Sequence, residues 1–105
     1  MRAKKRFGQH FLHDRTVVER IVDSLAPKAG ELLVEIGPGH GALTLPVLQR
    51  GLTLHVVEID RDLSVALQAH ALNGNLLVHN ADALHFDFAA LAADNRRLRL
   101  FGNLP

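Results

Sequence analysis

The sequence contains no cysteine. Without that residue the chain can form neither a disulfide nor a thiolate metal site. A protein without disulfides suits a reducing compartment, so we expect it to be cytoplasmic. Seven histidines are present, but none of them shows the His-x-His or His-Glu-x-x-His spacing of a metal site, and we expect no bound metal.

Long apolar runs are missing as well. No stretch approaches the ~20 apolar residues that a helix needs to cross a bilayer. Polar residues such as Gly8, Gln9, His13 and Asp14 interrupt any segment that could serve as the hydrophobic region of a signal peptide. The sequence therefore predicts a soluble protein without a membrane partner. Its 105 residues, 48% of them apolar, have the usual size of one domain.

The net charge of +1 is small, but the positive charges are unevenly placed. Four of them open the chain, at Arg2, Lys4, Lys5 and Arg6. This basic arm, residues 1–12, is a candidate for binding RNA phosphates, in which case binding weakens steeply with salt. The alternative is a solvated terminus. A second cluster consists of Arg96, Arg97 and Arg99. We interpret it as a group of solvated charges where a strand begins (a solvated strand entry), rather than as a second RNA site.

Hydrophobic spacing predicts strands that alternate with helices. We expect helices over 15–26, with Asp14 as N-cap, from about 43, over 62–70 and over 88–93, and strands over 32–36, 54–59, 76–79 and 98–101. This order predicts an α/β fold in which a parallel sheet carries helices on both faces. Right-handed crossovers would bring the carboxyl ends of all strands to one edge, where ligands bind.

A glycine-rich segment follows the first expected strand and reads Glu35-Ile-Gly37-Pro-Gly39-His-Gly41. Glycines allow a tight turn and a close approach of a ligand to the backbone. Glu58 stands 21 residues after Gly37, near the offset at which a carboxylate meets a ribose hydroxyl. The spacing favours a nucleoside ligand over the alternative, an ordinary tight turn.

Three acidic residues indicate which kind of nucleoside ligand the site would bind. Glu35, Glu58 and Asp82 should line the ligand edge with negative potential and repel a pyrophosphate or triphosphate. S-adenosylmethionine carries a sulfonium and an ammonium group and no phosphate, so the acids favour it, and no Gly-Lys-Ser/Thr follows the loop. We assign Glu58 to the ribose diol, Asp82 to the adenine amine and the Gly37–Gly41 backbone to the methionine part. A simple turn cap is the alternative for Asp82.

The last residues, Gly102-Asn103-Leu104-Pro105, follow the fourth expected strand at the same edge. The Asn103 side-chain oxygen and a carbonyl of Leu104 or Pro105 could accept hydrogen bonds from an aromatic amine and localise its lone pair toward an incoming methyl group. Methyl transfer then depends on proximity and alignment. A plain strand-ending turn is the alternative.

Several motifs together resemble the bacterial small-subunit ribosomal RNA adenine dimethyltransferases. They are Lys5-Arg-Phe-Gly-Gln-His-Phe-Leu12, Val34-Glu-Ile-Gly-Pro-Gly-His-Gly-Ala-Leu-Thr44, Val57-Glu-Ile-Asp60, Asp82-Ala83 and Gly102-Asn-Leu-Pro105. The resemblance implies a Rossmann-like class I methyltransferase that uses S-adenosylmethionine to dimethylate N6 of two adjacent adenosines near the 3′ end of 16S rRNA in the immature small subunit. It implies cofactor contacts by His10, Leu12, Gly37, Glu58, Asp82 and Asn103, beside Gly39 of the loop, and a catalytic role for Asn103, Leu104 and Pro105.

The sequence departs from the family pattern in two respects. The family frequently has Asn where His10 stands, and its last motif continues into an aromatic residue that stacks on the target base. We expect residues 13–105 to be the N-terminal part of the cofactor-binding domain, without the C-terminal helical domain. Such a fragment would be inactive alone, whereas the full-length enzyme would be a monomer.

Three other functions compete with this interpretation. The related 23S rRNA adenine methyltransferases of the macrolide-resistance type share the arm and the acids. A non-enzymatic RNA-binding assembly factor would retain RNA without binding the cofactor. An NAD-dependent enzyme would be protected by NADH and not by S-adenosylhomocysteine.

Overall fold

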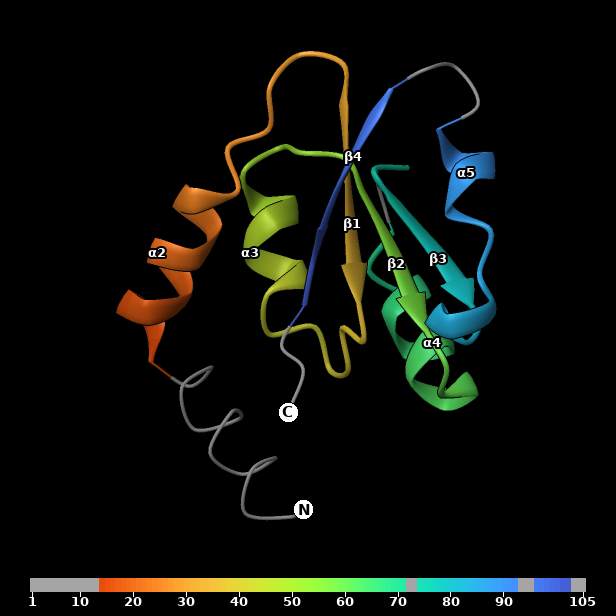
Figure 1. Cartoon of the computed structure of the whole chain (residues 1–105). Coiled ribbons are helices and arrows are strands. Elements are labelled where there is room, and N and C mark those ends of the chain that lie inside the picture. The colour runs from red at the N-terminus through yellow and green to blue at the C-terminus, as the bar shows by residue number, and fades with distance from the viewer. Residues whose placement is uncertain (1–13, 72–73, 93–95, 103–105) are drawn as a thin grey trace.

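The structure is a computed structural model that describes residues 14–71, 74–92 and 96–102. Helices and strands alternate along these residues (Figure 1). In chain order they are α2 (Arg15–Ser24), β1 (Glu31–Ile36), α3 (Thr44–Gln49), β2 (Leu54–Glu58), α4 (Arg61–Gln68), β3 (Leu76–Asn80), a 3-10 helix (Ala83–His85), α5 (Phe88–Leu91) and β4 (Arg97–Phe101). Each strand and helix expected from the sequence is present, with ends that differ by a few residues.

The four strands form one sheet in the order β3-β2-β1-β4. All three pairings are parallel, as the sequence predicted. The carboxyl ends therefore meet at one edge, the lower one in Figure 1, and the chain turns there from β1 into α3 and from β2 into α4. Within the described sheet β3 and β4 are the two edge strands.

One face of the sheet carries the main core. Helices α2, α3 and α4 pack on it with buried aliphatic side chains, among them Val18, Val22, Val47 and Leu67, against Leu33, Leu54, Val56 and Leu76 of the strands. Each such side chain contributes about 1.5–3 kcal/mol on burial. Burial of the apolar side of each helix thus fixes α2, α3 and α4 against the sheet.

Helix α2 begins where the sequence indicated. The Asp14 side chain accepts a hydrogen bond from the backbone N–H of Thr16 at 2.9 Å, which confirms it as the N-cap. The helix ends at Ser24, two residues earlier than predicted, because the N–H of Leu25 bonds to the Val22 carbonyl three residues back. Leu25 still fits the apolar spacing and is buried in the core.

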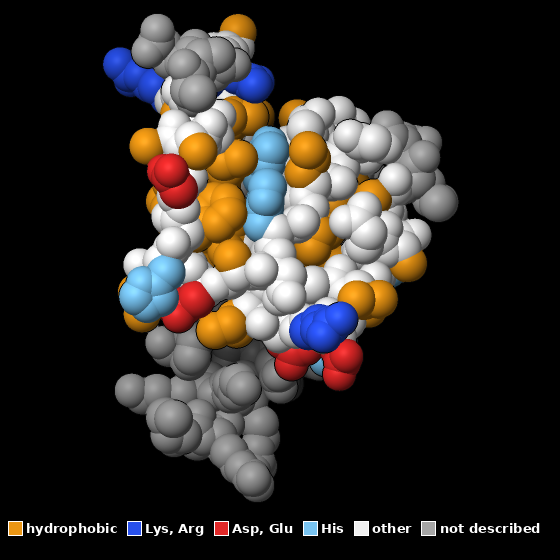
Figure 2. Space-filling model, turned by 90° about the vertical axis from the view of Figure 1, so that its right-hand side faces the viewer, with side chains coloured by type: hydrophobic (Ala, Val, Ile, Leu, Met, Phe, Trp, Pro, Cys, Tyr) orange, Lys and Arg blue, Asp and Glu red, His pale blue; other side chains and the backbone are white. Residues whose placement is uncertain are grey.

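The opposite face of the sheet is covered by the segment that leads into α5. Side chains alternate along a strand, so His55 and His79 point to this face. Their Nδ1 and Nε2 atoms lie 3.0 Å apart, and the His79 ring packs against Phe86, which contacts Phe88 of α5. Figure 2 shows histidine side chains among hydrophobic ones on this side. Helices thus lie on both faces, as predicted.

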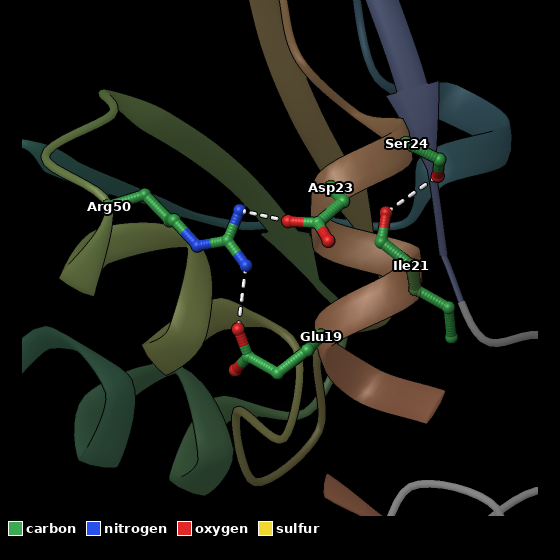
Figure 3. Close-up of polar contacts among 5 residues, drawn as sticks. All are labelled: Glu19, Ile21, Asp23, Ser24 and Arg50. Atoms are coloured by element: carbon green, nitrogen blue, oxygen red, sulfur yellow. Dashed lines mark hydrogen bonds and ion pairs between the residues drawn. The ribbon is translucent and has the colours of Figure 1, made fainter. Parts of the chain in front are cut away.

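Helices α2 and α3 are also linked by an ion-pair bracket. The guanidinium of Arg50, directly after α3, lies 2.6 Å from Glu19 and 2.6 Å from Asp23 of α2 (Figure 3). Glu19 and Asp23 are one helical turn apart and therefore share a face. Because all three side chains are partly exposed, water and salt screen their charges and the two pairs add little to stability. The bracket fixes the orientation of α2 relative to α3 more than it stabilises the fold.

In the ranges that the structure describes, none of the helices combines the length and apolar character required to span a membrane.

Candidate ligand-binding site at the carboxyl edge of the sheet

The loop between β1 and α3, residues 37–41, forms the centre of the edge and is called the glycine loop. It is anchored to β2 by the N–H of Gly37, which donates to the Val57 carbonyl at 2.9 Å. Gly39 has a φ of +58°, and a Cβ built there would meet nothing within 4 Å. Gly41 has a φ of +90°, and its Cβ would lie 3.2 Å from Leu67 of α4. The loop is therefore closed toward the core at Gly41 and open toward solvent at Gly39, where a ligand can approach the backbone.

Glu58 joins the glycine loop to the end of β2. Its Oε1 accepts a hydrogen bond from the Gly39 N–H at 3.0 Å, and its Oε2 accepts one from the Asp60 N–H at 2.9 Å. The residue is only 5% exposed. A carboxylate offers about four acceptor positions, so two remain for a hydroxyl pair. The structure thus brings into direct contact the acid and the loop that the sequence separates by 19 residues.

Asp82 lies at the same edge, after β3. Its Oδ1 accepts from the Leu84 N–H at 3.0 Å and caps the 3-10 helix, so the turn-cap interpretation is correct for this oxygen. The β3 end is held to the β2 end because Asn80 donates from Nδ2 to the carbonyls of Glu58 and Ile59, at 2.9 and 3.1 Å. Asp82 and Glu58 therefore follow adjacent strands on a common edge.

The expectation that Glu35 adds negative charge to the exposed edge needs correction. Its side chain is 2% exposed and lies beneath α3, where Thr44 donates its hydroxyl proton to Oε1 at 2.6 Å. Burial raises the pKa of Glu35 to about 7, the Thr44 hydrogen bond opposes this rise, and the nearby charge of Glu58 adds to it. Near neutral pH the buried Glu35 therefore carries less negative charge than an exposed carboxylate, so the negative potential depends mainly on Glu58 and the surface acids.

Two exposed apolar side chains at this edge were not singled out from the sequence. Ile59, directly after Glu58, is 67% exposed, and Leu84, two residues after Asp82, is 88% exposed. Apolar side chains beside carboxylates suit a ligand that combines a flat ring with polar hydroxyl and amine groups. Periodicity gives no signal for them, because Ile59 reads as the last residue of a strand and Leu84 as part of a turn.

The chain passes very close to β1 as it leaves β4. A Cβ built on Gly102 would lie 2.4 Å from the carbonyl oxygen of Ile36, which is backbone and cannot rotate away. Only glycine permits this approach. Gly102 therefore sets how closely the end of β4 approaches the start of the glycine loop.

The substitution Gly102→Ala should separate the end of β4 from β1. We expect a loss of about 1–3 kcal/mol in the free energy of unfolding, because a backbone overlap is relieved only by moving a strand. Amide hydrogen exchange would show it as faster exchange along Arg97–Phe101. Gly30→Ala, at a positive-φ glycine with open space around it, serves as control and should leave β4 protected. Equal protection of β4 in both variants would contradict the steric argument.

Several predicted functional residues lie outside the described residues. They are Arg2, Lys4, Lys5, Arg6, His10 and Leu12 in the N-terminal part, and Asn103, Leu104 and Pro105 after Gly102. Of the predicted cofactor contacts the structure describes Gly37, Gly39, Glu58 and Asp82, and it brings all four to the carboxyl edge. Among the residues it describes there is no group of three or more side chains arranged to hold a metal ion.

Comparison with known proteins agrees with this geometry. The model of a family described as "Ribosomal RNA adenine dimethylase" matches residues 1–105. The chain is 56% identical over 105 residues to a ribosomal RNA small subunit methyltransferase A from Nitrosococcus oceani, covering 99% of this chain and 40% of that protein. A protein of the same name from Tolumonas auensis is 54% identical, with 99% and 39% covered. The chain thus spans about 40% of the length of these relatives.

Solved structures show the same architecture. A dimethyladenosine transferase from Plasmodium falciparum superposes with a TM-score of 0.66 at 22% identity, over 88% of this chain and 32% of that one. A 23S rRNA methyltransferase, ErmE, gives 0.61 at 31% identity, over 73% and 32%. Coclaurine N-methyltransferase bound to N-methylheliamine and SAH gives 0.59 at 20% identity, over 70% and 23%. The Rossmann-like methyltransferase fold expected from the sequence is confirmed.

Proposed function

Because the chain belongs to the ribosomal RNA adenine dimethylase family, we propose that it forms the cofactor-binding part of an enzyme that dimethylates N6 of two adjacent adenosines near the 3′ end of 16S rRNA. The cofactor is S-adenosylmethionine, and the substrate is the RNA of the immature small subunit. Residues 1–12 form the RNA-binding arm and residues 13–105 the start of the cofactor domain. The full-length enzyme works as a monomer in the cytoplasm.

The observation that carries this proposal is the contact of Glu58 with the Gly39 N–H. The contact holds a buried carboxylate, which suits a ribose diol, directly beside a backbone that is open to a ligand. The second oxygen of Asp82 then accepts from the adenine amine, and Ile59 and Leu84 offer apolar contacts to the ring. The loop backbone holds the methionine part. A phosphate-bearing cofactor such as NAD would meet the charge of Glu58 instead, which disfavours it.

When bound, S-adenosylmethionine supplies an activated methyl group, and the protein positions this group and the adenine N6 amine relative to each other. The residues of the carboxyl edge, Gly37, Gly39, Glu58 and Asp82, would hold the cofactor near the end of β4. There Asn103, with Leu104 and Pro105, accepts hydrogen bonds from the adenine N6 amine and directs its lone pair toward the methyl group. His10 and Leu12 add contacts to the cofactor, and Arg2, Lys4, Lys5 and Arg6 contact RNA phosphates.

Among RNA substrates the small-subunit RNA is favoured over 23S rRNA. The two curated small-subunit relatives are 54–56% identical over 99% of the chain, whereas the 23S rRNA methyltransferase structure is 31% identical over 73%. Another candidate is an assembly factor that binds RNA without the cofactor. It differs from the proposed enzyme in one measurable property, because it would not bind S-adenosylmethionine.

The test is equilibrium dialysis of the 105-residue chain with labelled S-adenosylmethionine. Gly39→Ala is expected to weaken binding at least about tenfold, because its Cβ fills the space through which the ligand reaches the backbone. Gly51→Ala is the matched control, since Gly51 also has a positive φ and open space but follows α3 away from the edge. Each alanine costs about 1–2 kcal/mol of backbone strain.

Three results would contradict the proposal. One is an unchanged chain that retains RNA but does not bind S-adenosylmethionine, which would favour the assembly-factor function. The second is an equal effect of Gly39→Ala and Gly51→Ala on cofactor affinity, which would show that strain, and not a blocked approach to the loop, causes the loss. The third is protection by NADH but not by S-adenosylhomocysteine, which would point to the NAD-dependent alternative.

A further inference from the structure

A hollow of about 390 Å³ lies at the amino edge of the sheet, opposite the glycine loop. We name it the basic hollow; it is lined by Lys28, Ala29, Gly30, Glu31, Arg96 and Arg97. These residues come from two segments far apart in the sequence. The parallel pairing of β1 with β4 brings them together, because Glu31 is the register partner of Arg97. Both strands begin at the upper end of the sheet in Figure 1.

The lining of the basic hollow is strongly positive. Three cationic side chains stand against one carboxylate, so the formal charge of the lining is +2 while the whole chain carries +1. Arg99, whose guanidinium lies 3.6 Å from Glu31, adds a further cation behind the lining. Positive charge concentrated in a concave surface attracts a polyanion.

The single carboxylate of the hollow is already used by the protein. Oε1 of Glu31 accepts a hydrogen bond from the backbone N–H of Lys28 at 2.6 Å and faces Arg99. The side chains of Lys28 and Arg97 are both exposed, and within the described ranges neither of them forms an ion pair. These two cations therefore remain available to a ligand, and Glu31 holds the shape of the site.

The acids gather at the other end of the strands. Glu58 is the last residue of β2, and Asp60, Asp62 and Asp82 follow the carboxyl ends of β2 and β3, with the cation Arg61 among them. The molecule is therefore electrically polarised along its strands, with acids around the glycine loop and cations in the basic hollow. An RNA backbone is repelled from the first region and attracted to the second, so its phosphates need a contact away from the carboxyl edge.

Resting on the proposed function, we propose that the basic hollow binds the phosphate backbone of the substrate RNA, separately from the edge where the target adenosine meets the cofactor. This replaces the interpretation of Arg96 and Arg97 as a solvated strand entry, because the sequence did not show that Lys28 lies beside them. Strand β1 rises over five residue steps, so the two edges are about 16 Å apart. A nucleic-acid strand with a phosphate every ~3.4 Å of helix axis covers this distance with about five nucleotides. One RNA molecule can therefore reach both edges.

The test measures RNA binding by the 105-residue chain. The probe is a fluorescein-labelled RNA hairpin with unpaired adenosines in its loop, followed by anisotropy between roughly 50 and 200 mM KCl. The double variant Lys28→Ala, Arg97→Ala is expected to bind about tenfold more weakly at the low-salt end. The slope of log affinity against log salt should shrink by roughly 1.5, because two phosphate contacts are lost.

The matched control is the double variant Arg15→Ala, Arg20→Ala, which removes two exposed cations of α2 and thus the same charge. It should leave the slope unchanged. An equal loss of slope in both double variants, or no RNA binding by the unchanged chain, would overturn the proposal. Dialysis with labelled S-adenosylmethionine on the same preparations tests the proposed function separately, and the Lys28 and Arg97 substitutions should not affect it.

Discussion

Relative to the unchanged chain, Glu35→Gln should gain about 3 kcal/mol in the free energy of unfolding between pH 4 and pH 8. The pKa of Glu35 rises from an ordinary 4.5 to about 7 on folding. Between these values the folded state keeps a proton that the unfolded chain has lost, so stability falls as the pH rises. A shift of about 2.5 units corresponds to roughly 3 kcal/mol, all of it lost above pH 7. Glutamine does not titrate and retains an oxygen for the Thr44 hydroxyl.

Urea unfolding at several pH values measures this effect. The buried amide of glutamine adds a cost of its own, but that cost does not depend on pH, so the change between pH 4 and pH 8 is the quantity to compare. Asp62→Asn, which removes an exposed carboxylate in the first turn of α4, is the control and should keep the pH dependence of the unchanged chain. If Glu35→Gln kept it as well, Glu35 would not be the titrating group.

Glu58→Gln is expected to weaken the binding of S-adenosylmethionine by about 100-fold. A hydrogen bond to a charged group contributes about 1.5–3 kcal/mol, and the ribose diol would lose its charged acceptor. The glycine loop is affected too. A glutamine has one acceptor oxygen, so it cannot accept from both the Gly39 and the Asp60 N–H groups, as the carboxylate does.

Asp60→Asn separates this direct contact from a general effect of negative charge. Asp60 lies two residues from Glu58, is exposed, and caps α4 through a hydrogen bond from the Leu63 N–H that asparagine can also accept. Dialysis should show little change for this variant. If both substitutions weakened cofactor binding to the same degree, the potential of the edge, and not the contact made by Glu58, would account for the affinity.

The sequence was sufficient to predict a parallel sheet with the carboxyl ends of its strands at one edge, and to place Glu58 at that edge with the glycine loop. Both follow from local rules, the alternation of strands with helices and the position of an acid after the second strand. The sequence pattern placed Ile59 in the second strand, but β2 ends at Glu58 because Asp60 begins the capping of α4. Ile59 therefore lies outside the paired strand, and its side chain is exposed.

Properties that depend on burial could not be read from the sequence. Glu35 and Glu58 lie near the carboxyl ends of β1 and β2 on the same side of the sheet, yet α3 covers Glu35, and only the packed structure reveals its raised pKa. The basic hollow likewise requires the β1–β4 register, which places Glu31 opposite Arg97 across 66 positions of sequence. The sequence shows which residues are charged, but only the strand topology shows which of these residues lie together.

Within the residues that the structure describes, β4 is an edge strand, and arginine alternates with leucine along it. Two copies that met edge to edge in antiparallel fashion would set Arg97 and Arg99 of one beside those of the other, and that repulsion guards against self-association. A strand of different sequence, with neutral or acidic side chains at those positions, would meet no such barrier.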